Sequence, residues 1–282
     1  MGLTRVSLRL GLRLRRVETG GIEQRTIAAP NLDAAMEAFE THHNAPYSVA
    51  WIDCLSTGAS LGRSLIMLGD HAPLAGLPNK FRQVPFGPPP AQKRKVPFNA
   101  PSFALNRFTV KAFNALYYHM GARKTGTDYV PWDTYFYPLD SILGWNKIYG
   151  RRGFVQFQCV LPDGHARAGL EALLMRISDA GQGSFLAVLK KLATDTHKFS
   201  FPMAGYTLAL DFPVSEKVLS LMTELDSITL DHGGRFYLAK DARMTDTTLR
   251  ASDPRAEAFA AMRVETGAAG AFASLQSARL KL

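Results

Sequence analysis

The sequence predicts an α+β fold in which an antiparallel sheet carries helices packed on one of its faces. Strand-like segments with alternating apolar residues recur along the chain, and amphipathic helical segments lie between them. From residue 154 onward the order is strand, helix, strand, and the same order then repeats, which is typical of α+β layers. A length of 282 residues with 46% hydrophobic residues supplies enough material for a sizeable core.

The charges are unevenly distributed along the chain. The formal net charge is +9, yet no acidic residue occurs between Asp70 and Asp128. The cations of this window are Lys80, Arg82, Lys93, Arg94, Lys95, Arg107, Lys111, Arg123 and Lys124. Such a basic segment attracts phosphates, anionic lipid or nucleic acid.

The sequence has the composition of a soluble protein without a metal centre. No run approaches the ~18 apolar residues of a membrane helix, and no apolar secretory segment opens the chain. Cys54 and Cys159 lie in apolar strand patterns, so we expect reduced core cysteines in a cytoplasmic protein. The histidines lack ligand spacing, and no metal site is predicted.

The first part of the chain predicts two kinds of element. Residues 5–17 alternate leucine or valine with arginine and other small or polar residues, which predicts a half-exposed strand. Asn31 is expected to cap a helix that runs to about His43. Residues 47–54 and 60–68 fit two strands that are joined by a turn.

The middle of the chain is less regular. Residues 72–104 are rich in proline and predict a long loop, which in proteins is usually functional or disordered. Residues 105–119 fit either a helix or a strand, and residues 139–148 predict a short helix.

The second half predicts two strand–helix–strand units. Its strands are expected at 155–161, 185–189, 205–212 and 235–238, and its helices at 165–180, from 215 to the Gly233-Gly234 pair, and at 254–263.

The strand at 155–161 carries the most informative side chains. Its odd-numbered residues are apolar, whereas Gln156 and Gln158 point to the other face because strand side chains alternate. A buried amide without a partner costs about 1–3 kcal/mol. We therefore expect both glutamines to face a ligand, a polar network or water.

Motifs along the whole chain resemble those of one enzyme family. They are Met1–Thr4, Tyr47–Asp53, Leu61–Ser64, Tyr137–Gly150, Gly153–Pro162, Ser200–Tyr206, Gly233–Asp241 and Phe272–Ser274. In this order they resemble the FAD-linked sugar oxidases of the vanillyl-alcohol oxidase superfamily. The sequence shows no glycine-rich phosphate loop. The resemblance therefore implies a carboxy-terminal portion without the amino-terminal FAD-binding half, and we expect the isolated chain to be inactive and to bind FAD poorly.

The resemblance also implies a division of the chain. Residues 1–18 would be the terminal strand of an incomplete FAD domain, and residues 235–282 its carboxy-terminal segment. Residues 19–234 would form the substrate, or cap, domain with its long basic loop at 72–104.

Site residues follow from the same resemblance. Lys240 is expected to be catalytic, because alcohol oxidation by hydride transfer to flavin leaves a proton on oxygen. From the residues alone, a surface ion pair between Lys240 and Asp241 remains open. Tyr237 and Val6 would contact FAD. The substrate would meet Gln156, Gln158, Lys190 and Thr207.

Some positions depart from the family pattern. Arg5 replaces a glycine that would permit close approach to the flavin. Thr207 and Ala209 stand where close relatives carry asparagine and cysteine, and Leu275 replaces a frequent aspartate. These differences leave the exact sugar open.

Two functions from different classes remain. The first is the substrate-binding part of an FAD-dependent oxidoreductase acting on a sugar secondary alcohol, of the polyprenyl-phosphate pentose or aldonolactone type. Contact with a membrane surface, peripheral to the inner membrane, and self-association through the exposed FAD-domain interface would accompany it. The alternative is a non-catalytic module that binds anionic lipid or nucleic acid through residues 80–124. No nucleic-acid motif supports a nucleic-acid partner, and the first function is the one that we expect.

Overall fold

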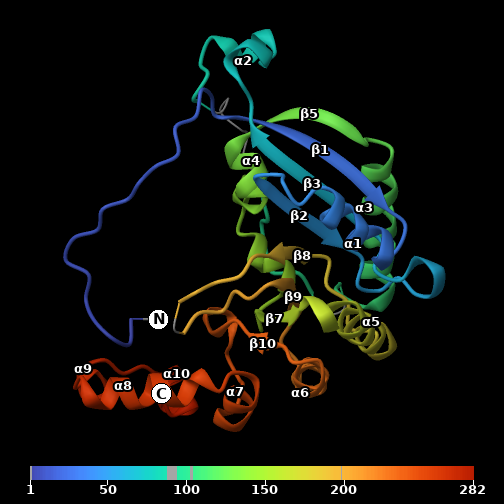
Figure 1. The fold of residues 1–282 in the computed structure, drawn as a ribbon. Coiled ribbons are helices and arrows are strands. Elements are labelled where there is room, and N and C mark those ends of the chain that lie inside the picture. Colours follow the sequence, from blue (N-terminus) through green and yellow to red (C-terminus); the bar gives the residue numbers. More distant parts are fainter. Residues whose placement is uncertain (1, 88–93, 102–103, 198) are drawn as a thin grey trace.

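An antiparallel eight-stranded sheet forms the centre of the molecule (Figure 1). The computed structural model describes residues 2–87, 94–101, 104–197 and 199–282. The strand order is β10-β7-β9-β8-β2-β3-β1-β5. Its strands are β1 (Gly21–Ala29), β2 (Tyr47–Ile52), β3 (Ser64–His71), β5 (Gly126–Pro131), β7 (Phe154–Pro162), β8 (Ala187–Leu192), β9 (Gly205–Pro213) and β10 (Arg235–Phe236).

Helices and one small parallel pair of strands complete the fold. The pair joins β4 (Arg94–Lys95) to β6 (Ile142–Leu143). The helices are α1 (Leu32–Thr41), α2 (Asn79–Arg82), α3 (Arg107–Ala122), α4 (Trp132–Phe136), α5 (Asp163–Ala180), α6 (Glu216–Asp231), α7 (Asp246–Ser252), α8 (Arg255–Glu265), α9 (Ala268–Ala271) and α10 (Leu275–Leu280). The predicted α+β class is confirmed.

The sheet consists of two halves with the same strand order. In chain order the first half is β1-α1-β2-β3-α3-β5, and the second is β7-α5-β8-β9-α6-β10. In each half the fourth strand lies beside the first, followed by the third and the second, which is the split βαβ arrangement. The halves join where β2 meets β8, through the pairs Ala50–Leu189 and Trp51–Val188.

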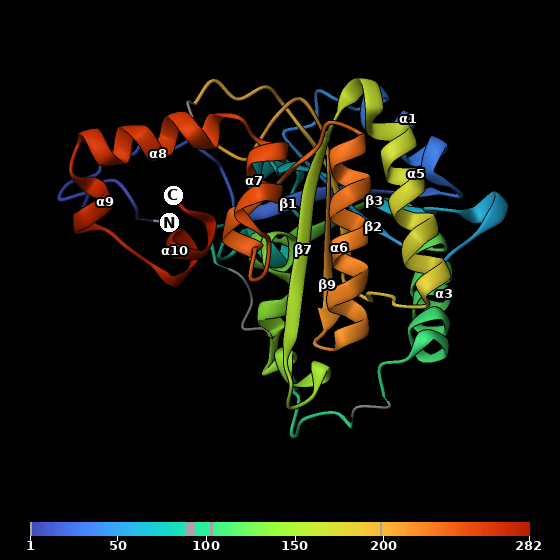
Figure 2. The ribbon, with the colours of Figure 1, turned by 90° about the horizontal axis from the view of Figure 1, so that it is seen from below.

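The main core lies on one face of the sheet, which we call the core face. Leu189 and Leu208, which are cross-strand partners, point to it together with Cys159. The helices α1, α5 and α6 cover this face (Figure 2). As predicted, Asn31 caps α1, Ser215 caps α6, and Gly181 ends α5 in the left-handed conformation at φ +63°.

The helix α3 lies on the opposite face, which we call the open face. Trp51 and Leu65 are cross-strand partners that point away from the core face. The ring of Trp51 lies 4.8 Å from that of Tyr117 on α3, and Leu65 packs against Gly121. Of the segment 105–119, which fitted a helix or a strand, residues 107–119 belong to this helix. The helix α3 covers the open face over β2, β3 and β1. It does not cover this face over β7, β9 and β8.

Two local predictions are wrong. Residues 5–17 form no strand, and their leucine and valine side chains at positions 6–14 are exposed. Arg15 forms an ion pair with Asp70 at the surface. The segment pairs with no described strand of the sheet. Residues 139–148 do not form one helix, because Gly144 at φ +67° separates two 3-10 turns, Pro138–Ser141 and Trp145–Tyr149.

The two ends of the chain meet beside the sheet (Figure 2). The buried guanidinium of Arg263 on α8 donates through Nε to the carbonyl of Leu3 at 2.9 Å and also donates to the carbonyl of Phe272.

Cys54 and Cys159 are both buried and form no disulfide, and burial raises the pKa of each thiol to about 12. In the predicted basic loop, Lys93 and Phe103 lie outside the described residues.

Candidate substrate site

A polar patch covers the open face where β7 and β9 run side by side. Gln156 donates through Nε2 to a carboxylate oxygen of Asp211 at 2.7 Å, and Gln158 donates to the hydroxyl of Thr207 at 3.1 Å. The Thr207 hydroxyl donates in turn to the carbonyl of Cys159 at 2.8 Å. The expected polar network of the two glutamines is present, and it consists of groups on the neighbouring strand.

Asp211 is the residue of this patch that the sequence analysis missed. It is buried, and burial raises the pKa of its carboxyl, while the Gln156 amide and the positive charge of Lys240 work in the opposite direction on that pKa. The signal was present in the sequence. Asp211 interrupts an otherwise apolar strand and follows Thr207 and Ala209 on the same face, as Gln158 follows Gln156.

An aromatic wall borders the patch on the side of α3. The ring of Tyr149 lies 4.8 Å from Phe154 and 5.4 Å from Phe185, stacked on both. Its hydroxyl is buried without a hydrogen-bond partner in the described structure. Burial, and after it the nearby charge of Asp211, raises the pKa of Tyr149. The wall thus carries a hydroxyl that stays protonated and has an unused donor.

Lys240 reaches the same region from another element. It ends the 3-10 turn η5 (Leu238–Lys240). This turn is tied to β7, because Tyr237 N–H donates to the Gln158 carbonyl at 3.0 Å and Lys240 N–H donates to the Tyr237 carbonyl at 2.9 Å. One pocket is lined by Gln156, Gln158, Tyr237 and Lys240. Four of the expected site residues therefore share a concavity.

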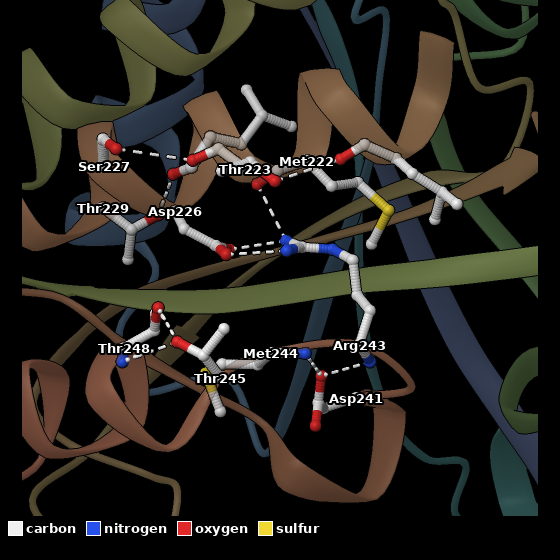
Figure 3. A network of polar contacts seen from close by, with 12 residues as sticks. Met222, Thr223, Asp226, Ser227, Thr229, Asp241, Arg243, Met244, Thr245 and Thr248 are labelled. Atoms are coloured by element: carbon white, nitrogen blue, oxygen red, sulfur yellow. Dashed lines mark hydrogen bonds and ion pairs between the residues drawn. The ribbon is translucent and has the colours of Figure 1, made fainter. Parts of the chain in front are cut away.

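A polar network holds the segment that follows Lys240 (Figure 3). Arg243 forms a two-pronged ion pair with Asp226 of α6, with N–O distances of 2.7 and 2.8 Å. Asp241 accepts from the N–H groups of Arg243 and Met244, and its carboxylate pairs with Arg279 at 2.7 Å. The charged partner of Asp241 is thus Arg279. The bidentate pair fixes geometry as well as charge, so the network fixes the backbone that carries Lys240.

The pKa values within this network reflect competing influences. Burial works against the charged form of Asp241, but the Met244 N–H and the Arg279 guanidinium outweigh it and lower the pKa of that carboxyl. For Asp226 burial dominates and raises the pKa, although Arg243 opposes it.

The remaining predicted site residues lie at different places. Lys190 is exposed at the end of β8, and its cross-strand partner is Thr207, so it shares the open face with the patch. Its neighbour Lys191 points to the core face, where its ammonium lies 5.3 Å from the ring centre of Tyr206. Val6 is exposed in the irregular first segment and is not among the residues that line the pocket of Lys240.

A second pocket opens on the other side of Tyr237. It is formed by residues 199–201, the segment 236–239 and the helix α7, and it shares Phe236 and Tyr237 with the pocket of Lys240. The ring of Tyr237 lies 4.8 Å from that of Phe201. Tyr237 is thus an aromatic divider between a polar and a more apolar space.

The arrangement offers the kinds of polar group that bind a polyhydroxylated ligand, next to a lysine. Two glutamine amides, a carboxylate and a threonine hydroxyl offer both donors and acceptors. Lys240 adds a group that can accept a proton when neutral or stabilise negative charge when protonated.

Comparison with known proteins gives a consistent relationship. No family model matches the chain. Its whole length aligns with decaprenylphosphoryl-beta-D-ribose oxidase of Mycolicibacterium smegmatis, with 34% identity over 287 residues, and spans 61% of that protein. It also aligns over its whole length with an uncharacterized protein in the mprA 5′ region of Streptomyces coelicolor, with 28% identity and 78% of that protein covered. The chain is thus similar over its whole length to an oxidase of a ribose derivative, in line with the resemblance seen in the sequence.

Proposed function

Because the chain is related over its whole length to an oxidase, we propose that it is the substrate-binding part of an FAD-dependent oxidoreductase. Its substrate is a sugar whose secondary alcohol is oxidised, of the polyprenyl-phosphate pentose or aldonolactone type; the name of the relative favours the first. The observation that carries the proposal is the pocket shared by Gln156 and Gln158 of β7 and Lys240 of η5, because these two elements are separated along the chain.

The proposed division of the chain assigns residues 19–234 to the substrate domain and residues 1–18 and 235–282 to an FAD domain. The bond from Arg263 to the Leu3 carbonyl supports this division, because it joins the two outer segments to each other beside the sheet.

The residues of this chain fit one side of a bound FAD. When bound, FAD supplies the oxidising power, because it accepts a hydride from the alcohol carbon. The partly exposed ring of Tyr237 stands between the two pockets and offers it an aromatic contact. Val6, which is exposed, would reach it only from the amino-terminal segment.

The chain's own contribution is to bind the sugar and to handle its proton. Gln156 and Gln158 present their amides to sugar hydroxyls from a rigid strand. Lys240 takes up the hydroxyl proton or stabilises the negative charge that develops on that oxygen. Lys190 lies on the same face at the end of β8, where it suits a phosphate group of the substrate.

Asp211 completes the proposed mechanism as a positioning residue. Its carboxylate accepts from Gln156 at 2.7 Å and lies within electrostatic reach of Lys240. A buried carboxylate of this kind orients the amide and draws the end of the lysine side chain toward it. It therefore couples the sugar-binding side of the pocket to the proton-handling side.

The proposal is tested by replacing Lys240 in a chimeric enzyme completed with the part of the relative that this chain does not cover. Lys240→Ala should lower turnover at least about a hundredfold, as expected for loss of a general base, while FAD stays bound. Lys217→Ala on α6 removes an exposed lysine on the core-face side and should leave turnover unchanged. Near-normal turnover of the Lys240 variant would remove this residue from the mechanism.

A second measurement uses the chain alone. Added FAD should be retained weakly, with little quenching of its fluorescence. A short-chain polyprenyl-phosphoryl pentose should bind to the chain and lose affinity in the Lys190→Ala variant. Absence of any binding of this compound would count against the substrate class.

A further inference from the structure

The solvent-exposed side of α3 carries a continuous apolar stripe. Phe113, Leu116, Tyr117 and Met120 follow one another at spacings of three, one and three residues, which places them on one side of a helix. All four are exposed, with Leu116 at 61% and Met120 at 50%. A surface helix normally turns such a stripe toward the core.

The stripe is not a consequence of a loosely attached helix. The buried side of α3 is a different one, formed by Val110 and Asn114. Asn114 donates through Nδ2 to the buried carboxylate of Asp53 at 2.9 Å, and Tyr118 donates to the carbonyl of Ala29 at 3.2 Å. Polar anchors therefore hold the helix so that Leu116 and Met120 stay exposed. The rings of Phe113 and Tyr117 on the same side lean against Phe185 and Trp51 and remain partly exposed.

Only cations accompany the stripe. Arg123 and Lys124 follow Met120 by three and four residues, so they extend the same side of the helix past its end, and both are exposed. No acidic residue lies between positions 107 and 124. An apolar stripe that ends in exposed cations matches the interface of a bilayer, where the methyl and ring groups enter the acyl boundary and the cations meet phosphate groups.

We propose that the apolar stripe of α3 docks this protein on the surface of a bilayer that contains anionic lipid. The contact is peripheral, and none of the described helices is long and apolar enough to cross a membrane. Leu116 and Met120 favour hydrocarbon as the occupant over nucleic acid, because aliphatic side chains gain nothing from phosphate, whereas stacking on bases would require aromatic residues throughout.

The position of the stripe agrees with this occupant. Phe113 lies 5.9 Å from Phe185, which in turn stacks on Tyr149 beside Asp211. The stripe and the polar patch are thus connected along one side of the sheet by a row of rings. If the proposed function holds, docking brings the open face toward the lipid phase; the docking itself does not depend on that function.

The test is co-sedimentation of the full chain with vesicles. We expect binding to phosphatidylglycerol–phosphatidylcholine vesicles and much weaker binding to pure phosphatidylcholine. Leu116→Ser should weaken binding about tenfold, given ~1.5–3 kcal/mol for full burial of a leucine. Met120→Ser should act in the same direction and is compared with Met175→Ser. Met175 on α5 is equally exposed, at 51%, but lies on the helix layer of the core face.

The cations have a matched control on the same helix. Arg123→Gln with Lys124→Gln should weaken binding about fivefold per charge, from about 1 kcal/mol for each cation near an anionic surface. Lys111→Gln removes an exposed charge far from the stripe and should have less effect. Unchanged melting temperatures would show that the variants remain folded.

Several outcomes would overturn the proposal. Equal binding to neutral and anionic vesicles would remove the role of the cations, and full binding by Leu116→Ser would remove the stripe. Competition by an oligonucleotide, with loss of vesicle binding on its addition, would identify nucleic acid as the occupant. A dimer in light scattering that Leu116→Ser dissociates, without vesicle binding, would identify a second copy.

Discussion

The two halves of the sheet share a strand order but treat the open face differently. In the first half α3 covers this face and closes over Trp51 and Leu65. In the second half both helices, α5 and α6, lie on the core face, which leaves the open face of β7 and β9 free for Gln156, Asp211 and their neighbours. The same strand arrangement thus yields a covered half and a half that carries the site, depending on where one helix lies.

Each half also contains a buried aspartate, and their surroundings differ. Asp53 in the first half pairs with Arg63 at 2.8 Å and accepts from Asn114. Within the described residues, the carboxylate of Asp211 in the second half accepts from one side chain, the neutral Gln156, and the charge of Lys240 lies farther away. A fully compensated carboxylate supports structure, whereas an incompletely compensated one is typical of a functional site.

The largest change in the free energy of unfolding is expected on replacing Asp53, the fully compensated carboxylate. Asp53→Asn should lower the free energy of unfolding by about 3 kcal/mol, because it leaves the Arg63 charge without its partner at a mostly buried site. Urea denaturation measures this change. Asp33→Asn, which removes an exposed partner of Arg167, is the control and should stay within about 0.5 kcal/mol. A loss for Asp53→Asn no larger than that of the control would contradict the structural role of Asp53.

The anchoring of α3 should give the next largest effect. Asn114→Leu keeps a similar volume but removes the donor to Asp53, and we expect a loss of about 2 kcal/mol. Hydrogen exchange should also rise along α3 and not along α5. Equally faster exchange in α3 and α5 would show that Asn114 stabilises the whole domain and not only the packing of α3 on the open face.

A smaller effect of opposite sign is expected for the second half. The raised pKa of Asp211 means that its contribution to stability is full below the unfolded pKa and is lost as pH rises through the folded pKa. Asp211→Asn keeps an acceptor for Gln156 and removes the buried charge, so it should stabilise the protein by about 1 kcal/mol at pH 7. The gain should vanish toward pH 3, which denaturation curves at several pH values would reveal. Destabilisation at pH 7 would assign Asp211 to structure.

The smallest effect concerns the stripe. Leu116→Ser should change the free energy of unfolding by no more than about 0.5 kcal/mol, because an exposed side chain loses little on replacement. Leu174→Ala on α5, which is fully buried on the core face, should instead cost about 2–5 kcal/mol. A comparable loss for both would mean that the stripe is packed in solution.

Local signals predicted much of the fold. The caps at Asn31 and Ser215 and the stop at Gly181 located three helices of the core face, because capping and periodicity depend on neighbouring residues. The alternation at 5–17 failed for the opposite reason. Strand formation requires a hydrogen-bonding partner elsewhere in the chain, and residues 5–17 pair with no described strand.

The site was predictable to the extent that its residues carry a strand pattern. Gln156 and Gln158 stood out by alternation, and Asp211 carried the same signal on β9 without being recognised. The meeting of Lys240 with the glutamines was expected only from the family resemblance, because it depends on a backbone bond between Tyr237 and Gln158 that no local pattern specifies. The outward stripe of α3 escaped because an amphipathic helix by itself does not reveal which side is anchored.

The short junction between β2 and β8 has a mechanical consequence. Only two paired positions join these strands, whereas nine join β7 to β9. The indole of Trp51, which donates to the Phe185 carbonyl at 3.0 Å, and the contacts of Cys54 with Ser184 reinforce this junction from the side. Under a force that pulls the two halves apart, we expect the β2–β8 pairing to break before the other strand pairings. Each part would then keep its own strand pairing, while the contact between the rings of Phe113 on α3 and Phe185 is lost.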